Sequence, residues 1–70
     1  MWIRSQDRKK LKEIHDVGIY RDNKIWVDYS FIGEYSTKEK ALKVLDEIVH
    51  HLEYHCVEVY QMPQDEDVEA

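Results

Sequence analysis

The fold is decided by residues 36–54, which read STKEKALKVLDEIVHHLEY. Ser36 followed three residues later by Glu39 is typical of a capping box, in which each side chain pairs with a free N–H at the start of a helix. Behind this box, apolar residues recur at spacings of three and four, so they form one stripe along a helix. The sequence therefore predicts an amphipathic helix over about 37–54, with the apolar stripe Ala41, Leu42, Val44, Leu45, Ile48, Val49 and Leu52.

The residues on either side of this helix read as β-strands. Residues 25–29 and 31–35 are rich in β-branched and aromatic side chains, and they meet at a tight turn near Tyr29. Before them, Asp22 and the Asn that follows suit a hairpin turn, because both residue types tolerate positive φ. Gly18, inside an upstream strand, indicates a bulge or a close approach. The predicted strands are 2–6, 13–20, 25–29, 31–35 and, after the helix, 56–62.

This order, β-β-β-β-α-β, predicts an α+β fold in which one helix packs on one face of an antiparallel or mixed sheet of about five strands. A single helix covers only one face, and the eight aromatic residues do not all fit beneath it. The other face is therefore expected to be a homo-oligomer interface or a ligand platform. Scattered exposed aromatics are the ordinary alternative. Some of the following residues are expected to be exposed or to meet a partner: Trp2, Tyr20, Trp26, Tyr29, Phe31, Tyr35 and Tyr60.

Length and composition bound the domain organisation. Seventy residues, 43% of them hydrophobic and 36% charged, are enough for one small globular domain. We expect this domain to span 1–63 and the acidic residues 64–70 to form a disordered tail. No uncharged run is long enough to cross a membrane, the first residues do not resemble a secretory signal, and the single Cys56 excludes an internal disulfide. These features predict a cytoplasmic protein.

The net charge of -5 is unevenly distributed along the chain. Residues 1–24 carry seven Lys or Arg and four acids, whereas residues 25–70 carry three Lys and eleven acids. An acidic protein is not expected to bind nucleic acid in general, because that affinity comes mainly from neutralising phosphates. The basic first third nevertheless leaves room for a local anion-binding patch.

Three blocks of the sequence carry a resemblance to known proteins. They are residues 1–8, MWIRSQDR, residues 32–48, IGEYSTKEKALKVLDEI, and residues 59–63, VYQMP. Together they resemble small uncharacterised proteins of Gram-positive bacteria and of their phages and prophages. The resemblance carries no known activity, catalytic residue or cofactor. It implies a cytoplasmic product of a bacterium or mobile element, of the kind that blocks a host factor or captures a small signal.

A basic segment is one candidate binding site. Arg4-Ser5-Gln6-Asp7-Arg8-Lys9-Lys10 suits a phosphate of a nucleotide or nucleic acid, with nearby aromatic rings stacking on a base. No Gly-rich phosphate loop accompanies it. In the more ordinary alternative, residues 4–7 form a hydrogen-bonded turn that is followed by a solvated basic run. The candidate binding residues are thus Trp2, Arg4, Ser5, Gln6, Arg8, Lys9, Tyr20, Trp26, Tyr29 and Tyr35.

The histidine-rich end of the predicted helix is a second candidate. His51 and His55 are four residues apart, so they share a helix face, with Glu47 one turn earlier and Cys56 adjacent. Two imidazoles with a carboxylate or thiolate are a reasonable zinc set. Histidines near a helix C-terminus are also favoured by the helix dipole alone. We therefore predict no metal or other cofactor, with His51 and His55 as the candidate ligands should one bind.

Catalysis finds little support in the sequence. Cys56 beside a histidine suggests a thiolate nucleophile, but a lone Cys at the start of a strand is more often a small buried hydrophobe. A chain this short also has too few layers to build a water-excluding cleft. The sequence predicts a non-enzymatic binding protein, a homo-oligomer that blocks a host protein or captures a small anionic, nucleotide-like ligand. A nucleic-acid-associated protein and a metal-stabilised domain stay open as alternatives.

Overall fold

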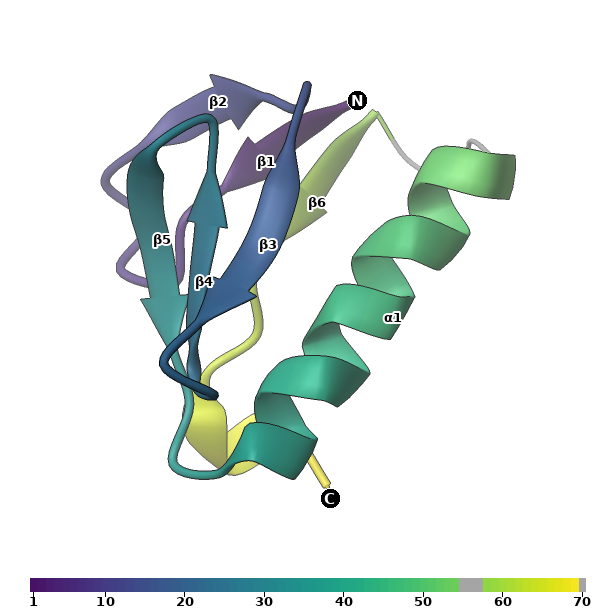
Figure 1. The fold of residues 1–70 in the computed structure, drawn as a ribbon. Coiled ribbons are helices and arrows are strands. Elements are labelled where there is room, and N and C mark those ends of the chain that lie inside the picture. The colour runs from purple at the N-terminus through teal and green to yellow at the C-terminus, as the bar shows by residue number, and fades with distance from the viewer. Residues whose placement is uncertain (55–57, 70) are drawn as a thin grey trace.

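The computed structural model of the protein describes residues 1–54 and 58–69. Within these ranges it contains strands, one α-helix and a short 3₁₀ helix, which confirms the predicted α+β class (Figure 1). The elements are β1 (Trp2–Arg4), β2 (Leu11–Glu13), β3 (Val17–Tyr20), β4 (Lys24–Val27), β5 (Ser30–Glu34), α1 (Lys38–Tyr54), β6 (Val59–Gln61) and the 3₁₀ helix η1 (Asp65–Asp67).

The predicted helix is confirmed as α1, but its cap differs by one residue. The N–H of Lys40 donates to Thr37 Oγ1 at 3.2 Å, so Thr37 and not Ser36 caps the helix. The fully buried stripe is also narrower than expected, because Leu42 and Val49 lie at its margins and are exposed. Its members are Ala41, Val44 and Ile48. Among the described residues, no helix is long and apolar enough to cross a membrane.

The single sheet of about five strands is wrong, because the strands form two three-stranded sheets. In one, β1 lies between β2, which is antiparallel to it, and β6, which is parallel to it. In the other, β3, β4 and β5 form an antiparallel meander. The two sheets meet at Gln6, whose N–H donates to Ile32 O at 2.8 Å and whose Oε1 accepts from Glu34 N–H at 2.9 Å.

The predicted strand 13–20 is divided between these two sheets. β2 ends at Glu13 and β3 begins at Val17, and the chain turns a corner between them. Asp28 holds this corner, because its Oδ1 accepts from Asp16 N–H at 2.8 Å while its own N–H donates to Asp16 O at 3.0 Å. A side chain distant in sequence therefore decides where the strand breaks, which the local pattern does not show.

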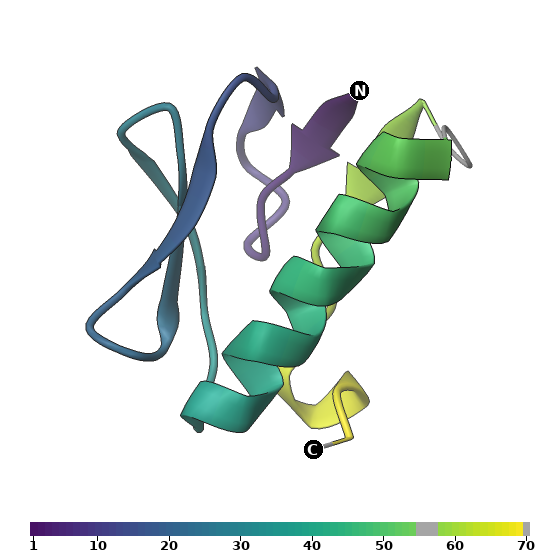
Figure 2. The same cartoon turned by 45° about the vertical axis from the view of Figure 1, so that its right-hand side comes forward.

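The core lies between the two sheets and α1 (Figure 2). Ile3 on β1, Ile25 on β4 and Ile48 on α1 are completely buried there. Tyr35 was expected on an exposed aromatic face, but it is 1% exposed and its hydroxyl donates to Pro63 O at 2.8 Å inside the core. Tyr60, another of the seven aromatic residues considered for that face, is buried as well.

The two buried phenols lie near one carboxylate. The hydroxyl of Tyr60 donates to Glu47 Oε2 at 2.7 Å, which joins β6 to α1. Burial raises the pKa of both Tyr35 and Tyr60, and the negative charge of Glu47 raises it further. Both rings therefore remain neutral and act as structural hydrogen-bond donors.

Residues 64–69 are packed against the domain, in place of the predicted disordered tail. Val68, the apolar residue of this acidic stretch, is 8% exposed and joins the core. Asp65 fastens the segment to the start of α1, since Oδ1 accepts from Ser36 N–H at 2.7 Å and Oδ2 lies 3.5 Å from Lys40 Nζ. Hydrogen bonds from Gln64 to Gln6 O and from Lys43 to Glu69 O add to these contacts and hold the hydrophilic stretch against the domain.

Acid is expected to loosen this C-terminal segment. The N–H of Ser36 and the charge of Lys40 hold the pKa of Asp65 below its usual range. Because the folded-state pKa is the lower one, the stabilisation is complete above the unfolded pKa of about 4 and is lost as pH falls through the folded value. In an NMR titration, the Ser36 amide and Val68 methyl signals should shift together below about pH 4.

The variant Asp65→Asn should show the shifted Ser36 and Val68 signals already at neutral pH. Glu66→Gln is the matched control, because Glu66 is a neighbouring exposed carboxylate. If the Val68 signals stay unchanged until the whole domain unfolds, Asp65 does not fasten the segment.

Candidate functional site

The candidate site lies on the outer face of the β3–β4–β5 sheet. Side chains alternate between the two faces of a strand, so the burial of Ile25 and Val27 in the core places Lys24 and Trp26 outside. Across the ladder, Gly18 pairs with Trp26 and Tyr20 pairs with Lys24. A tryptophan therefore lies directly beside a residue that has no side chain.

A row of three aromatic rings crosses this outer face, with one ring from each strand. Tyr20 on β3 and Trp26 on β4 meet edge to face, with ring centroids 6.1 Å apart and planes at 84°. Phe31 on β5 continues the row, 5.7 Å from Trp26 at 63°. Such edge-to-face pairs stabilise one another. The row is nevertheless open to solvent, since Tyr20 is 58% and Phe31 38% exposed.

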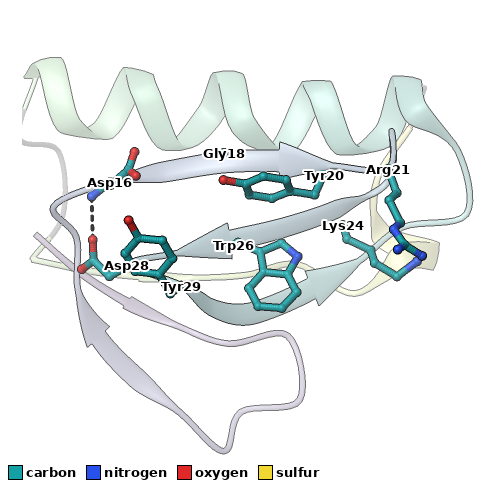
Figure 3. A pocket seen from close by; sticks show the side chains of 8 residues that line it. All are labelled: Asp16, Gly18, Tyr20, Arg21, Lys24, Trp26, Asp28 and Tyr29. Atoms are coloured by element: carbon teal, nitrogen blue, oxygen red, sulfur yellow. Dashed lines mark hydrogen bonds between the residues drawn. The ribbon is translucent and has the colours of Figure 1, made fainter.

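The row borders a hollow of about 560 Å³, hereafter the outer hollow, which lies over β3 and β4 (Figure 3). This volume is within the range of small-molecule sites. Gly18 contributes to its floor, and a Cβ built there would have only Tyr20 Cε2, at 3.9 Å, among nearby side chains and backbone. The missing side chain of Gly18 thus keeps the space beside Trp26 open.

The two ends of the outer hollow carry opposite charges (Figure 3). Arg21 and Lys24 lie at one end, and Asp16 and Asp28 lie at the other. Asp28 lies four positions after Lys24 in the sequence, which corresponds to about 13 Å along a strand. The Nζ of Lys24 lies 3.2 Å from Glu34 Oε1 in an exposed ion pair. Exposed pairs contribute little stability, so the ammonium is free to turn to another anion at small cost.

The cationic end also holds a hydrogen-bond donor that has no acceptor. Within the described residues, Trp26 Nε1 is buried and makes no hydrogen bond. Figure 3 shows this nitrogen on the side of the ring that faces Lys24. A buried donor without an acceptor costs about 1–3 kcal/mol. Arg21 and Lys24 therefore make this end suited to an acceptor-rich, negatively charged group, and the indole N–H lies buried beneath it.

At the acidic end, the Asp28 carboxylate is held by hydrogen bonds, whereas the neighbouring Tyr29 is exposed. Both oxygens of Asp28 are engaged, Oδ1 by Asp16 N–H and Oδ2 by His15 Nδ1 at 3.2 Å. Next to it, the β4–β5 turn consists of Asp28 and Tyr29, which have φ values of 48° and 68°. Positive φ is unfavourable for a bulky aromatic residue, and Tyr29 is 93% exposed. Strained positions of this kind occur preferentially at functional sites.

The structure divides the predicted binding residues among several places. Tyr20, Trp26 and Tyr29 come together at the outer hollow. Trp2 and Arg4 lie on the other sheet, where both are exposed. Gln6 joins the sheets, Tyr35 lies in the core, and the remaining three residues, Ser5, Arg8 and Lys9, lie in the β1–β2 turn.

The β1–β2 turn is held by its own side chains. Ser5 is 2% exposed, and its Oγ accepts from Lys10 N–H at 3.0 Å. The carboxylate of Asp7 accepts from the Ser5 hydroxyl and from Lys9 N–H, and these two hydrogen bonds lower the pKa of Asp7. Arg8 has a φ of 66°, which closes the turn. This geometry matches the alternative in which the segment is a hydrogen-bonded turn with exposed cations beside it.

Sequence reasoning missed five of the eight residues that line the outer hollow. Asp16, Gly18, Arg21, Lys24 and Asp28 line it but were not among the candidate residues. Most of them could have been selected from the sequence, because they stand an even number of positions from Tyr20 on β3 or Trp26 on β4. Residues spaced in this way lie on the same face of a strand.

The histidine-rich end of α1 shows one described imidazole that packs on the core. His51 is half-buried, its ring lies 5.2 Å from that of Tyr60, and its Nδ1 has no hydrogen-bond partner among the described residues. The other predicted ligands, His55 and Cys56, lie outside the described residues. Within the part of the chain that is described, no three His, Cys, Asp or Glu side chains are grouped to hold a metal ion.

The class of molecule follows from this geometry: a small α+β domain with a ligand-sized hollow on an aromatic sheet face. Comparison of the chain with protein-family profiles, with curated proteins and with solved structures finds no match. The functional assignment therefore rests on the residues of the outer hollow.

Proposed function

We propose that the protein is a non-enzymatic binding protein that captures a small, ring-containing anion in the outer hollow. A nucleoside monophosphate is the representative ligand of this class. The observation that carries the proposal is the open aromatic row beside a hollow whose one end bears Arg21 and Lys24.

The ring of the ligand would lie over Gly18, against Trp26. Gly18 contributes no side chain there, the ring of Tyr20 extends towards Gly18, and Tyr29 lies nearer the acidic end (Figure 3). Stacking of a base on an aromatic side chain contributes about 1–3 kcal/mol and works for every base, because each base has a π-face. The aromatic residues thus supply affinity for planar rings in general.

The anionic group of the ligand would lie at the Arg21–Lys24 end. A guanidinium matches a phosphate with two parallel hydrogen bonds, and an ammonium adds a point charge. Lys24 would exchange its exposed pair with Glu34 for the ligand, which costs little. The net charge of -5 opposes any anion at longer range, so we expect modest affinity.

Binding without catalysis suits a hollow that is open to solvent. Tyr29 at its rim is 93% exposed, and His15, which lies beside Asp28, has a side chain that is 73% exposed. Groups that stand in water lack the dry surroundings that strengthen catalytic electrostatics. Capture of a small molecule is also one of the two roles that the resemblance to phage and prophage proteins implies.

Calorimetric titration of the protein with AMP, adenosine and inorganic phosphate tests the proposal. AMP should bind more tightly than either fragment, because it alone reaches the aromatic row and the cationic end together. Replacing both cations, Arg21→Gln with Lys24→Gln, should weaken AMP binding by about tenfold or more, since each charge-assisted hydrogen bond contributes about 1.5–3 kcal/mol. The same change should leave adenosine binding unaltered.

A matched control removes two cations elsewhere. Arg8→Gln with Lys9→Gln changes the net charge equally but lies in the β1–β2 turn. AMP affinity should hold in this variant. Loss of binding here, with retention in the Arg21 and Lys24 variant, would move the site to the basic N-terminal segment. No heat or melting shift with AMP, GMP, CMP or UMP would refute capture of a nucleotide.

A further inference from the structure

A second exposed face, unrelated to the outer hollow, lies on the β2–β1–β6 sheet. Because Ile3 in the middle of β1 points into the core, its neighbours Trp2 and Arg4 point outward. We call this surface the β1 face. Its three apolar members, Trp2, Leu11 and Val59, are 43–55% exposed. A group of large apolar side chains on one small sheet marks an interaction surface.

The charges on the β1 face have a definite arrangement. In the register of β1 with β2, Trp2 lies opposite Glu13 and Arg4 lies opposite Leu11. These four residues occupy the corners of a near-square, about 7 Å along a strand and about 5 Å between strands. The two apolar residues therefore share one diagonal, and the two oppositely charged residues share the other.

This square is complementary to itself. A two-fold axis that runs between two facing copies along the Trp2–Leu11 diagonal exchanges the positions of Arg4 and Glu13. Each Arg4 then faces the Glu13 of the other copy, while the apolar residues meet at the axis. An isologous contact requires one surface patch that fits itself in this way.

We propose that the β1 face is the contact between two copies of this chain. The partner is a second copy of the chain, because the same patch on that copy offers apolar residues to the apolar corners and an opposite charge to each charged corner. The strands of the face are only three residues long, so the interface is small and belongs to the weak class. The dimer is therefore expected to dissociate on dilution.

A charge-swap experiment in the analytical ultracentrifuge tests this contact. Wild-type protein should sediment as a monomer–dimer mixture that shifts with concentration. Arg4→Glu or Glu13→Arg alone should weaken the dimer at least about tenfold, because each puts like charges face to face. The double variant Arg4→Glu with Glu13→Arg should restore the dimer, since the pair is re-formed with its charges reversed.

Controls separate this contact from general charge effects. Lys38→Glu and Glu53→Arg make the same two charge changes on exposed positions of α1 and should leave the dimer unchanged. Melting temperatures show whether each single variant folds. A wild-type protein that is monomeric at every concentration overturns the proposal. So does a dimer that the single changes leave intact, or one that the folded double variant fails to recover.

Discussion

Replacing Ile48 by Ala should lower the free energy of unfolding by about 2–5 kcal/mol, the usual cost of emptying a filled core site. Ile48 is completely buried on α1, and it belongs to the one core that both sheets share. A chain of this length has a total stability of only about 4–10 kcal/mol. The variant is therefore expected to be largely destabilised, and partly unfolded at 37 °C. Urea denaturation followed by circular dichroism measures the loss.

The neighbouring residue provides the control for this effect. Val49 is 40% exposed on the same helix, so Val49→Ala should change the free energy of unfolding by about 0.5 kcal/mol or less. Equal losses from Ile48→Ala and Val49→Ala would mean that α1 buries a different face from the one described.

Replacing Gly18 by Val should abolish measurable binding of AMP, which corresponds to a loss of about a hundredfold or more in affinity. The new side chain fills the space beside Trp26 that the proposed ligand ring requires. The protein should stay folded, because the Cβ meets nothing closer than Tyr20 Cε2 at 3.9 Å and because valine favours strands over glycine. Calorimetry with AMP and thermal melting together make the measurement.

Gly33 provides the contrast, because only at Gly18 is a new side chain expected to block AMP binding while the protein stays folded. A Cβ at Gly33 would lie 2.9 Å from Met62 Cε and 3.5 Å from Gln6 Cβ, on the core side of β5. Gly33→Ala is therefore expected to lower stability by about 1 kcal/mol or more through overpacking. In the fraction that folds, it should leave AMP affinity unchanged. A Gly18→Val variant that binds AMP as the wild type does would remove the outer hollow from consideration.

The helix and most strands could be predicted because their signals are local. The three- and four-residue spacing of apolar side chains predicted α1 within one residue of its observed start. The β-branched and aromatic run at 25–29 likewise predicted β4. The predicted N-cap, Ser36, was one residue too early. Ser36 and Thr37 both suit a helix cap, and only the structure shows that Thr37 accepts the Lys40 N–H.

The division into two sheets could not be predicted, because it depends on contacts between residues far apart in the sequence. Asp28 breaks the strand at Asp16, and Gln6 pairs with β5 across 26 residues or more. Val68 likewise orders an acidic stretch that looks hydrophilic on its own. None of these contacts leaves a periodic pattern in the chain.

The aromatic half of the outer hollow could be predicted, whereas its charged half could not. Tyr20, Trp26 and Tyr29 were selected because exposed rings on a sheet face indicate a contact surface. Lys24 shares the alternation of Trp26 on β4, whereas Arg21 lies between the strands, and nothing in the sequence shows that the hairpin folds it to the outer hollow. Tyr35 was misplaced because its hydroxyl finds the carbonyl of Pro63 only once the chain has folded.

The most direct test of the binding site uses the two tryptophan side chains as reporters in one NMR spectrum. Trp26 lies at the outer hollow and Trp2 lies on the other sheet, so their indole N–H signals report on the two faces separately. On titration with AMP, the Trp26 signal should move progressively to saturation, because the ligand ring lies against the indole, while the Trp2 signal stays in place. A Trp26 signal that remains fixed while AMP binds and other signals move would contradict the account.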